Sequence, residues 1–124
     1  MMTGSKGARV AIAVLALLLL SRTALAHAFP DHSLPRVGSQ LTTAPTSVRI
    51  WFDGDIEPVF STLIVKTAAG AKVSAGKGRV SSSNSTLLET PLPHKLAPGK
   101  YYVYWSVIAR DGHHTEGRFP FRVK

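Results

Sequence analysis

The sequence predicts an all-β domain, an immunoglobulin-like Greek-key β-sandwich or barrel of about seven strands. Three observations predict this fold class. Apolar and polar residues alternate with a period of two in several short segments, turn-forming residues separate these segments, and no helical face of useful length occurs. The chain has 124 residues and no Cys. We therefore expect one small domain without disulfide bonds or thiolate metal ligands.

The clearest strand patterns are residues 47–52 and 101–110, where alternate residues such as Val48, Ile50 and Phe52 are apolar. Weaker patterns predict strands at residues 61–67, 72–81, 85–90 and 118–124. Pro120 places the last strand at an edge or a bulge, because proline cannot donate to a β-ladder. Residues 96–101 match a tyrosine corner, in which the Tyr101 hydroxyl bonds an upstream backbone group, and this favours Greek-key topology.

Residues 1–26 have the pattern of a secretory signal peptide. A basic start precedes the apolar run 10–20, and the segment ends in Ala24-Leu25-Ala26. The apolar run is too short for a membrane-spanning helix, which needs about 20 residues. Cleavage would leave residues 27–124 as an exported domain that is not inserted in the membrane. Its net charge would be +5 instead of +8, and an exported, mildly basic domain has little access to nucleic acid.

Cleavage after Ala26 would make His27 the first residue of the mature chain. Its free α-amine and its imidazole could then close a chelate ring on one metal ion. The alternative is that a His at this position is an accident of a frayed terminus. Both Met residues lie in the leader, so any metal bound by the mature domain must be held by nitrogen and oxygen.

A second candidate motif is Asp111-Gly112-His113, which follows the long strand pattern directly. Gly112 allows the backbone to bend so that a carboxylate and an imidazole point toward one position. The alternative is an ordinary turn in which the Asp side chain bonds the backbone. Combined with His27, the motif supplies an amine, two imidazoles and one carboxylate, a donor set that suits copper(II).

At this level of detail the sequence resembles the CopC (CopC/YobA-type) family of periplasmic copper-binding proteins over residues 27–124. Four blocks carry the resemblance: His27-Ala28 followed by Ser33 and Pro35; residues 48–52 leading to Ile56-Glu57-Pro58; Pro98-Gly99-Lys100-Tyr101 with Val103, Trp105 and Val107; and Asp111-Gly112-His113. The resemblance implies that His27, Asp111 and His113 bind one copper(II) per chain. It also implies a periplasmic carrier or buffer in copper homeostasis or resistance, with a CopD-like inner-membrane protein or another copper-handling protein as a candidate partner.

Several positions depart from the family pattern. The Met-rich stretch that holds copper(I) in some members is missing, which implies a copper(II)-only variant. Phe29 stands where other members have a third-position His, and Gly54 stands where a Glu often lies near the metal, so Asp53 or Asp55 could substitute for it. His114 falls where a Pro is common. We expect His32 and His94 to be solvated loop residues.

Two other functions are compatible with the same residues. Polysaccharide monooxygenases also bind copper through a terminal His on an immunoglobulin-like sandwich, but Asp111 as a further ligand would crowd the oxygen position, and the domain has little room for substrate-binding loops. A metal-free interaction domain is the third hypothesis. We expect a binding protein and not an enzyme.

Overall fold

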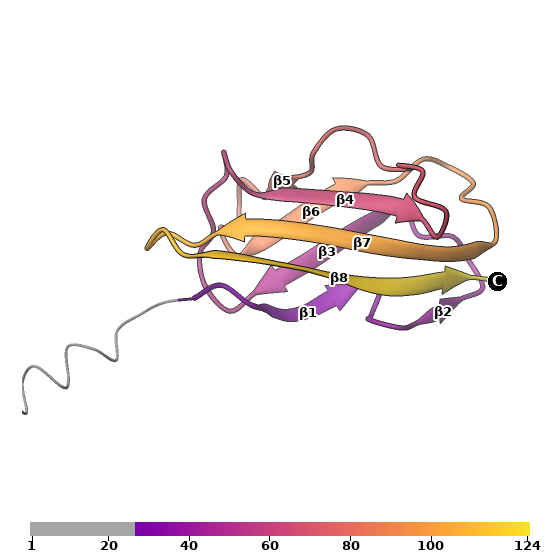
Figure 1. Cartoon of the computed structure of the whole chain (residues 1–124), viewed down its shortest axis with the longest axis horizontal. Helices are drawn as coiled ribbons and strands as arrows, with labels where there is room; N and C mark the ends of the chain where they lie inside the picture. Colours follow the sequence, from indigo (N-terminus) through magenta and orange to yellow (C-terminus); the bar gives the residue numbers. More distant parts are fainter. Residues whose placement is uncertain (1–26) are drawn as a thin grey trace, which may run out of the picture.

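The computed structural model describes residues 27–124, which form two four-stranded sheets packed face to face (Figure 1). The predicted signal peptide, residues 1–26, lies outside the described residues. The eight strands are β1 (Pro30–Leu34), β2 (Gln40–Leu41), β3 (Ser47–Phe52), β4 (Thr62–Thr67), β5 (Arg79–Val80), β6 (Leu87–Pro91), β7 (Gly99–Ile108) and β8 (His114–Val123). The predicted all-β sandwich is confirmed, with eight strands instead of about seven. Within residues 27–124 no helix has the length and apolar content to cross a membrane.

The first sheet has the order β1-β3-β6-β5, and every neighbouring pair in it is antiparallel. The inward residues of β3 are the alternating apolar ones, and Val48, Ile50 and Phe52 are all buried. The pairing of β1 with β3 shifts register between Pro30 and His32. This irregularity lies beside the segment that carries His27.

The second sheet has the order β2-β8-β7-β4, and its main feature is the long β7–β8 hairpin. The two strands pair over their full length, from Gly99 with Val123 to Ile108 with His114. The turn is closed by two backbone bonds, from Ala109 N to His113 O at 2.9 Å and from Gly112 N to Ala109 O at 2.8 Å. The hairpin therefore presents residues 110–113 at one end of the sandwich.

The core lies between the two sheets. It is built from the inward residues of β3, β4, β6, β7 and β8, including Leu63, Val103, Val107 and Phe121. Tyr101 packs its ring against Phe121, and its hydroxyl donates to the Ala97 carbonyl at 2.5 Å. The predicted tyrosine corner is confirmed.

Four strands differ from the prediction: β1, β2, β5 and β8. Strands β1 and β2 were not predicted, because β1 contains one buried residue, Ser33, and β2 is only two residues long. The strand expected at 72–81 is limited to Arg79–Val80, since Gly76 and Gly78 both take positive φ angles that interrupt a β conformation. The last strand begins at His114, four residues earlier than predicted.

Pro120, which has no N–H to donate, lies at a β8 position where no N–H is needed for pairing with β7. Its carbonyl accepts a bond from the Gly38 amide, on the side of β8 away from β7. Because the nitrogen and the carbonyl of one strand residue point to the same side, the missing N–H also faces away from β7. No β7–β8 ladder bond is lost. The predicted edge position does not hold for the strand as a whole, because β8 lies between β2 and β7, but β2 pairs only with Arg122 and Val123 and not with Pro120.

Gly78 provides a test of packing at the start of β4. A Cβ at this residue would lie 2.8 Å from Leu63 Cβ and 3.1 Å from the Leu63 backbone, and φ is +76°. Gly76 has a similar φ of +68° but open space around it. We expect Gly78→Ala to lower the free energy of unfolding by about 1–3 kcal/mol more than Gly76→Ala does, measured by urea denaturation. Equal losses in the two variants would show that the Leu63 contact is unimportant.

Candidate metal centre

The candidate site lies at the end of the sandwich where the N-terminal segment meets the β7–β8 turn. The imidazole rings of His27 and His113 are 4.7 Å apart between centroids and meet edge to face at 72°. The Nδ1 atom of His113 lies 2.9 Å from Oδ2 of Asp111. The structure thus brings the three predicted ligand residues into one cluster, although His27 lies 84 positions before Asp111 in the chain.

His27 is positioned by the two residues that follow it. Ala28 is completely buried, and its carbonyl accepts a hydrogen bond from Thr115 Oγ1 at 2.6 Å. Phe29 donates its amide to Asp53 Oδ1 at 2.8 Å, and the Asp53 amide donates to the Phe29 carbonyl at 2.9 Å. These bonds tie the segment both to β8 and to the loop after β3. His27 is therefore held beside the hairpin.

Gly54 allows the close approach of this segment. A Cβ at Gly54 would lie 3.2 Å from the His27 carbonyl oxygen, which is tighter than ordinary van der Waals contact. The two neighbouring carboxylates, Asp53 and Asp55, have partners in the segments around the site. Asp53 accepts the Phe29 amide, while Asp55 accepts the Ser85 hydroxyl at 2.5 Å and lies 3.5 Å from Arg110 Nη1. Both residues hold loops together around the site.

The Asp111 carboxylate makes two contacts with His113. Its Oδ1 accepts the His113 amide at 3.1 Å, and its Oδ2 faces the imidazole Nδ1. The backbone bond is the main cause that lowers the pKa of Asp111 below its ordinary value of 3.8, with smaller contributions from the imidazoles of His113 and His27. The turn considered as an alternative in the sequence is therefore present, and it orients the carboxylate toward the imidazole.

Asp111 and His113 contact each other directly. Oδ2 of Asp111 and Nδ1 of His113 are 2.9 Å apart, which is the distance of a hydrogen-bonded ion pair. A metal ion bound by both atoms would have to replace this contact. Within residues 27–124 no group of three His, Cys, Asp or Glu side chains already has metal-binding geometry. The cluster therefore supplies two adjacent donors and a nearby third residue, His27.

The remaining histidines lie apart from the cluster of His27, Asp111 and His113, and two of them have partners of their own. His114 Nε2 lies 2.7 Å from Ser106 Oγ and 3.9 Å from Glu116. His32 is a strand residue of β1 and not the loop residue we expected. Its exposed ring stacks on Trp51 at 4.5 Å, and its Nδ1 lies 2.8 Å from Asp31. His94 lies in an exposed bend, as predicted.

Fold and cluster together define a β-sandwich protein with a candidate nitrogen and oxygen metal site at one end. Comparison with known proteins defines the class further. Residues 31–124 match the CopC domain family. The chain belongs to the CopC family of copper resistance proteins and is similar to YobA.

Two curated relatives illustrate this membership. Protein YobA of Escherichia coli strain K12 is 30% identical over 124 residues, which cover both chains completely. The copper transport protein CutJ of Bacillus subtilis strain 168 is 30% identical over 112 residues, which are 90% of this chain but only 21% of CutJ.

Solved structures agree with the fold. CopC from Methylosinus trichosporium OB3b superposes with a TM-score of 0.73 at 28% identity, covering 79% of this chain and 94% of that one. PcoC, a methionine-rich copper resistance protein from Escherichia coli, has a TM-score of 0.69 at 23% identity, covering 80% and 100% of the two chains. The PcoC likeness supports the fold alone.

The bond from Thr115 to Ala28 gives a test of how His27 is positioned. We expect Thr115→Val to lower the free energy of unfolding by about 1 kcal/mol, since it removes one hydrogen bond while keeping the side-chain shape. Copper(II) affinity should fall by about tenfold, as for other partners that orient a metal ligand. Urea denaturation and a competitive copper titration measure the two effects.

Thr90→Val is the matched control for this variant. Thr90 is buried near the end of β6, where it pairs with Val48 at the start of β3. Its hydroxyl has no hydrogen-bond partner within residues 27–124. Its replacement should leave copper affinity unchanged and stability equal or higher. Unchanged copper affinity in Thr115→Val would mean that the Ala28 anchor does not position His27.

Proposed function

We propose that the protein is an exported copper(II) carrier or buffer that holds one copper ion through His27, Asp111 and His113. The convergence of these three residues at one end of the sandwich carries the proposal. The His27 and His113 rings lie 4.7 Å apart, and the Asp111 carboxylate lies 2.9 Å from the second imidazole. An amine, two imidazoles and a carboxylate form a nitrogen-rich set that suits copper(II).

Cleavage of residues 1–26 would complete this ligand set. In the uncleaved chain the His27 nitrogen belongs to a peptide bond with Ala26 and cannot act as an amine ligand. In the mature chain it would become a free α-amine, whose proton a metal can displace. The proposed signal peptide therefore both directs the domain to the periplasm and generates one of its metal donors.

Copper(II) selectivity follows from the residues of the mature domain. The sequence from 27 to 124 contains neither Cys nor Met, so it has no soft ligands for copper(I). The lowered pKa of Asp111 keeps its carboxylate charged at neutral pH and well below it. A charged carboxylate attracts a divalent cation, whereas a protonated one would not.

A carrier role fits this donor set better than a catalytic one. A monooxygenase that activates oxygen must keep coordination positions open, whereas here the carboxylate and both imidazoles would occupy positions around the ion. The copper transport function in the name of CutJ is in line with a carrier. The acceptor that we propose is a copper-handling protein, for example a CopD-like protein of the inner membrane.

Adjacent histidines provide the test of the ligand set. In the mature protein, we expect His113→Ala to weaken copper(II) binding by more than the roughly 10–100-fold typical of losing an outer-shell partner. His114→Ala, which removes an imidazole bonded to Ser106, should leave affinity within about twofold of the parent protein. A competitive titration with a chelator measures both.

Asp111→Asn refines this test. The Asn side-chain oxygen can still accept the His113 amide, so the turn should persist, while the negative charge is lost. Affinity should fall although the fold is kept. The ligand assignment would be wrong if His113→Ala and Asp111→Asn both bound copper as tightly as His114→Ala.

A further inference from the structure

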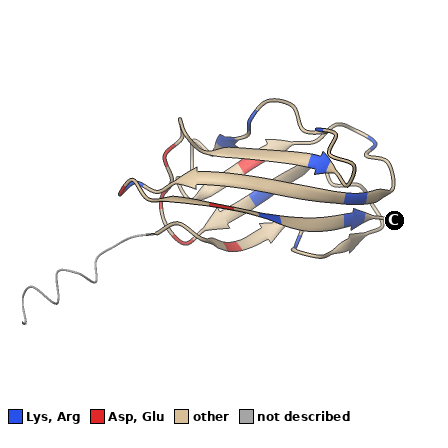
Figure 2. Cartoon of the chain, in the orientation of Figure 1, with Lys and Arg blue, Asp and Glu red and all other residues tan. Residues whose placement is uncertain are grey.

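The outer face of the β2-β8-β7-β4 sheet carries an alternating set of tyrosines and cations. We define the cationic face by the residues that share this side of the sheet: Lys66 on β4, Lys100, Tyr102 and Tyr104 on β7, and Arg118 and Arg122 on β8. The cross-strand pairs Lys66 with Tyr102, Tyr104 with Arg118 and Lys100 with Arg122 make these residues neighbours. Figure 2 shows the Lys and Arg positions gathered toward the end of the sheet remote from the 109–113 turn.

Three of the four cations of this face lie over tyrosine rings. Lys66 Nζ is 5.2 Å from the centroid of Tyr104, Lys100 Nζ is 5.1 Å from that of Tyr102, and the Arg118 guanidinium is 4.7 Å from Tyr102. Such cation–π contacts hold long side chains in place without neutralising their charge. Lys100, followed by Arg118, also lowers the pKa of the Tyr102 hydroxyl. The face therefore presents a fixed positive potential.

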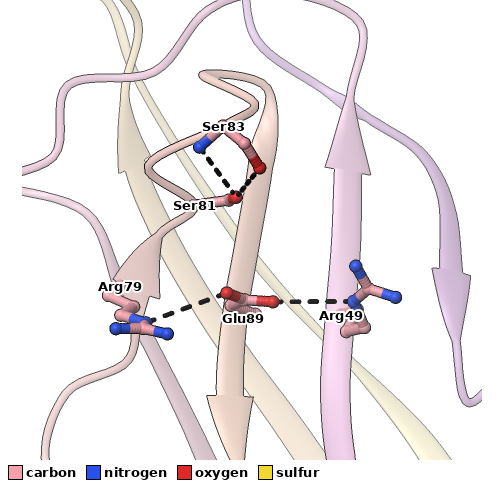
Figure 3. A network of polar contacts seen from close by, with 5 residues as sticks. All are labelled: Arg49, Arg79, Ser81, Ser83 and Glu89. Carbon is pink, nitrogen blue, oxygen red and sulfur yellow. Dashed lines mark hydrogen bonds and ion pairs between the residues drawn. The ribbon is translucent and has the colours of Figure 1, made fainter.

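These cations have no carboxylate partners among the ion pairs of residues 27–124. The opposite sheet is different: there Glu89 lies 3.6 Å from Arg49 Nε and 3.8 Å from Arg79 Nε, so one carboxylate serves two arginines (Figure 3). No equivalent of Glu89 accompanies Lys66, Lys100, Arg118 or Arg122 in the described part of the chain. A ligand with negative charges could therefore pair with these cations.

A hollow of about 470 Å³ adjoins the cationic face. Arg118, Tyr104 and Ser106 line it and offer hydrogen-bond donors, with Thr62 and Ile64 on the β4 side. Arg118 Nη1 already lies 3.4 Å from the Tyr104 hydroxyl, so the two groups can donate to the same acceptor. Glu116 lines the side nearer His114 and would repel an anion there. The positive end of the hollow is thus the end that joins the cationic face.

We propose that the cationic face binds an acidic segment of a partner protein, with Asp or Glu carboxylates accepting from Arg118 and Tyr104 and lying near Lys100 and Lys66. Charge complementarity carries this choice, because planar guanidinium groups match carboxylates well. A lipid bilayer is a poorer match. The large exposed apolar side chains within residues 27–124 are Phe29, Leu34, Val37, Val59 and Phe60, and none lies on this face. The surface is separate from the metal cluster, so this inference does not rest on copper binding.

An oligoglutamate peptide tests the proposal on the copper-free protein. NMR amide shift changes on titration should concentrate on β4, β7 and β8, and binding should weaken as salt is raised. The double variant Lys100→Gln/Arg118→Gln should weaken binding by about tenfold. Tyr102→Leu, which leaves net charge unchanged, should also weaken it, because both cations over that ring lose their support.

Arg79→Gln/Arg49→Gln is the matched control, since it removes two charges from the opposite sheet. It should leave peptide affinity within about twofold of the parent protein. The proposal is wrong if this control weakens binding as much as Lys100→Gln/Arg118→Gln, or if the shift changes spread over both sheets. It is also wrong if vesicles of phosphatidylglycerol and phosphatidylcholine bind the face while the peptide does not.

Discussion

The candidate metal site depends on how the chain before β1 is anchored to the sandwich. Ala28 is completely buried, and its carbonyl is bonded by Thr115 of β8. Small size matters here, because a larger side chain would have to displace the surrounding core. One residue earlier, His27 is exposed beside His113. The burial of Ala28 therefore fixes the backbone beside His27, and this places the exposed imidazole next to His113.

The second half of the site depends on the pairing of β7 with β8. Ten cross-strand pairs keep the two strands in register up to the turn, so both ends of the segment 109–113 are fixed. Within the turn, the His113 amide holds the Asp111 carboxylate. Two segments distant in sequence thus meet at one end of the sandwich, where the His27 and His113 rings lie 4.7 Å apart.

Much of this arrangement was predictable from the sequence. Alternation in residues 47–52 and 101–110 identified the central strands, and the residues it placed inside, such as Val48 and Val107, are buried. The tyrosine corner and the three clustered residues were also identified. Strands β1 and β2 were missed because their residues carry almost no apolar alternation. They are ordered by pairing with β3 and β8, which is a tertiary effect.

The supporting contacts of the site could not be read from the sequence. The role of Asp53 or Asp55 as a replacement for a Glu near the metal stays a prediction, whereas their contacts with Phe29, Ser85 and Arg110 are seen only in the structure. The bond from Thr115 to Ala28 joins residues 87 positions apart. Local patterns contain no information on such partners. The cationic face escaped notice for the same reason, since it forms only when three strands align.

The central claim is that His27 contributes both its imidazole and its α-amine. A copper(II) titration with electron paramagnetic resonance, comparing protein that begins at His27 with protein that carries one additional N-terminal Gly, tests it most directly. We predict one copper per chain for the His27 protein. The extended protein should bind copper(II) more weakly, by more than the roughly 10–100-fold typical of losing an outer-shell partner. Its spectrum should also change, because an amine nitrogen is lost. Identical affinity and spectrum in both proteins would contradict the account.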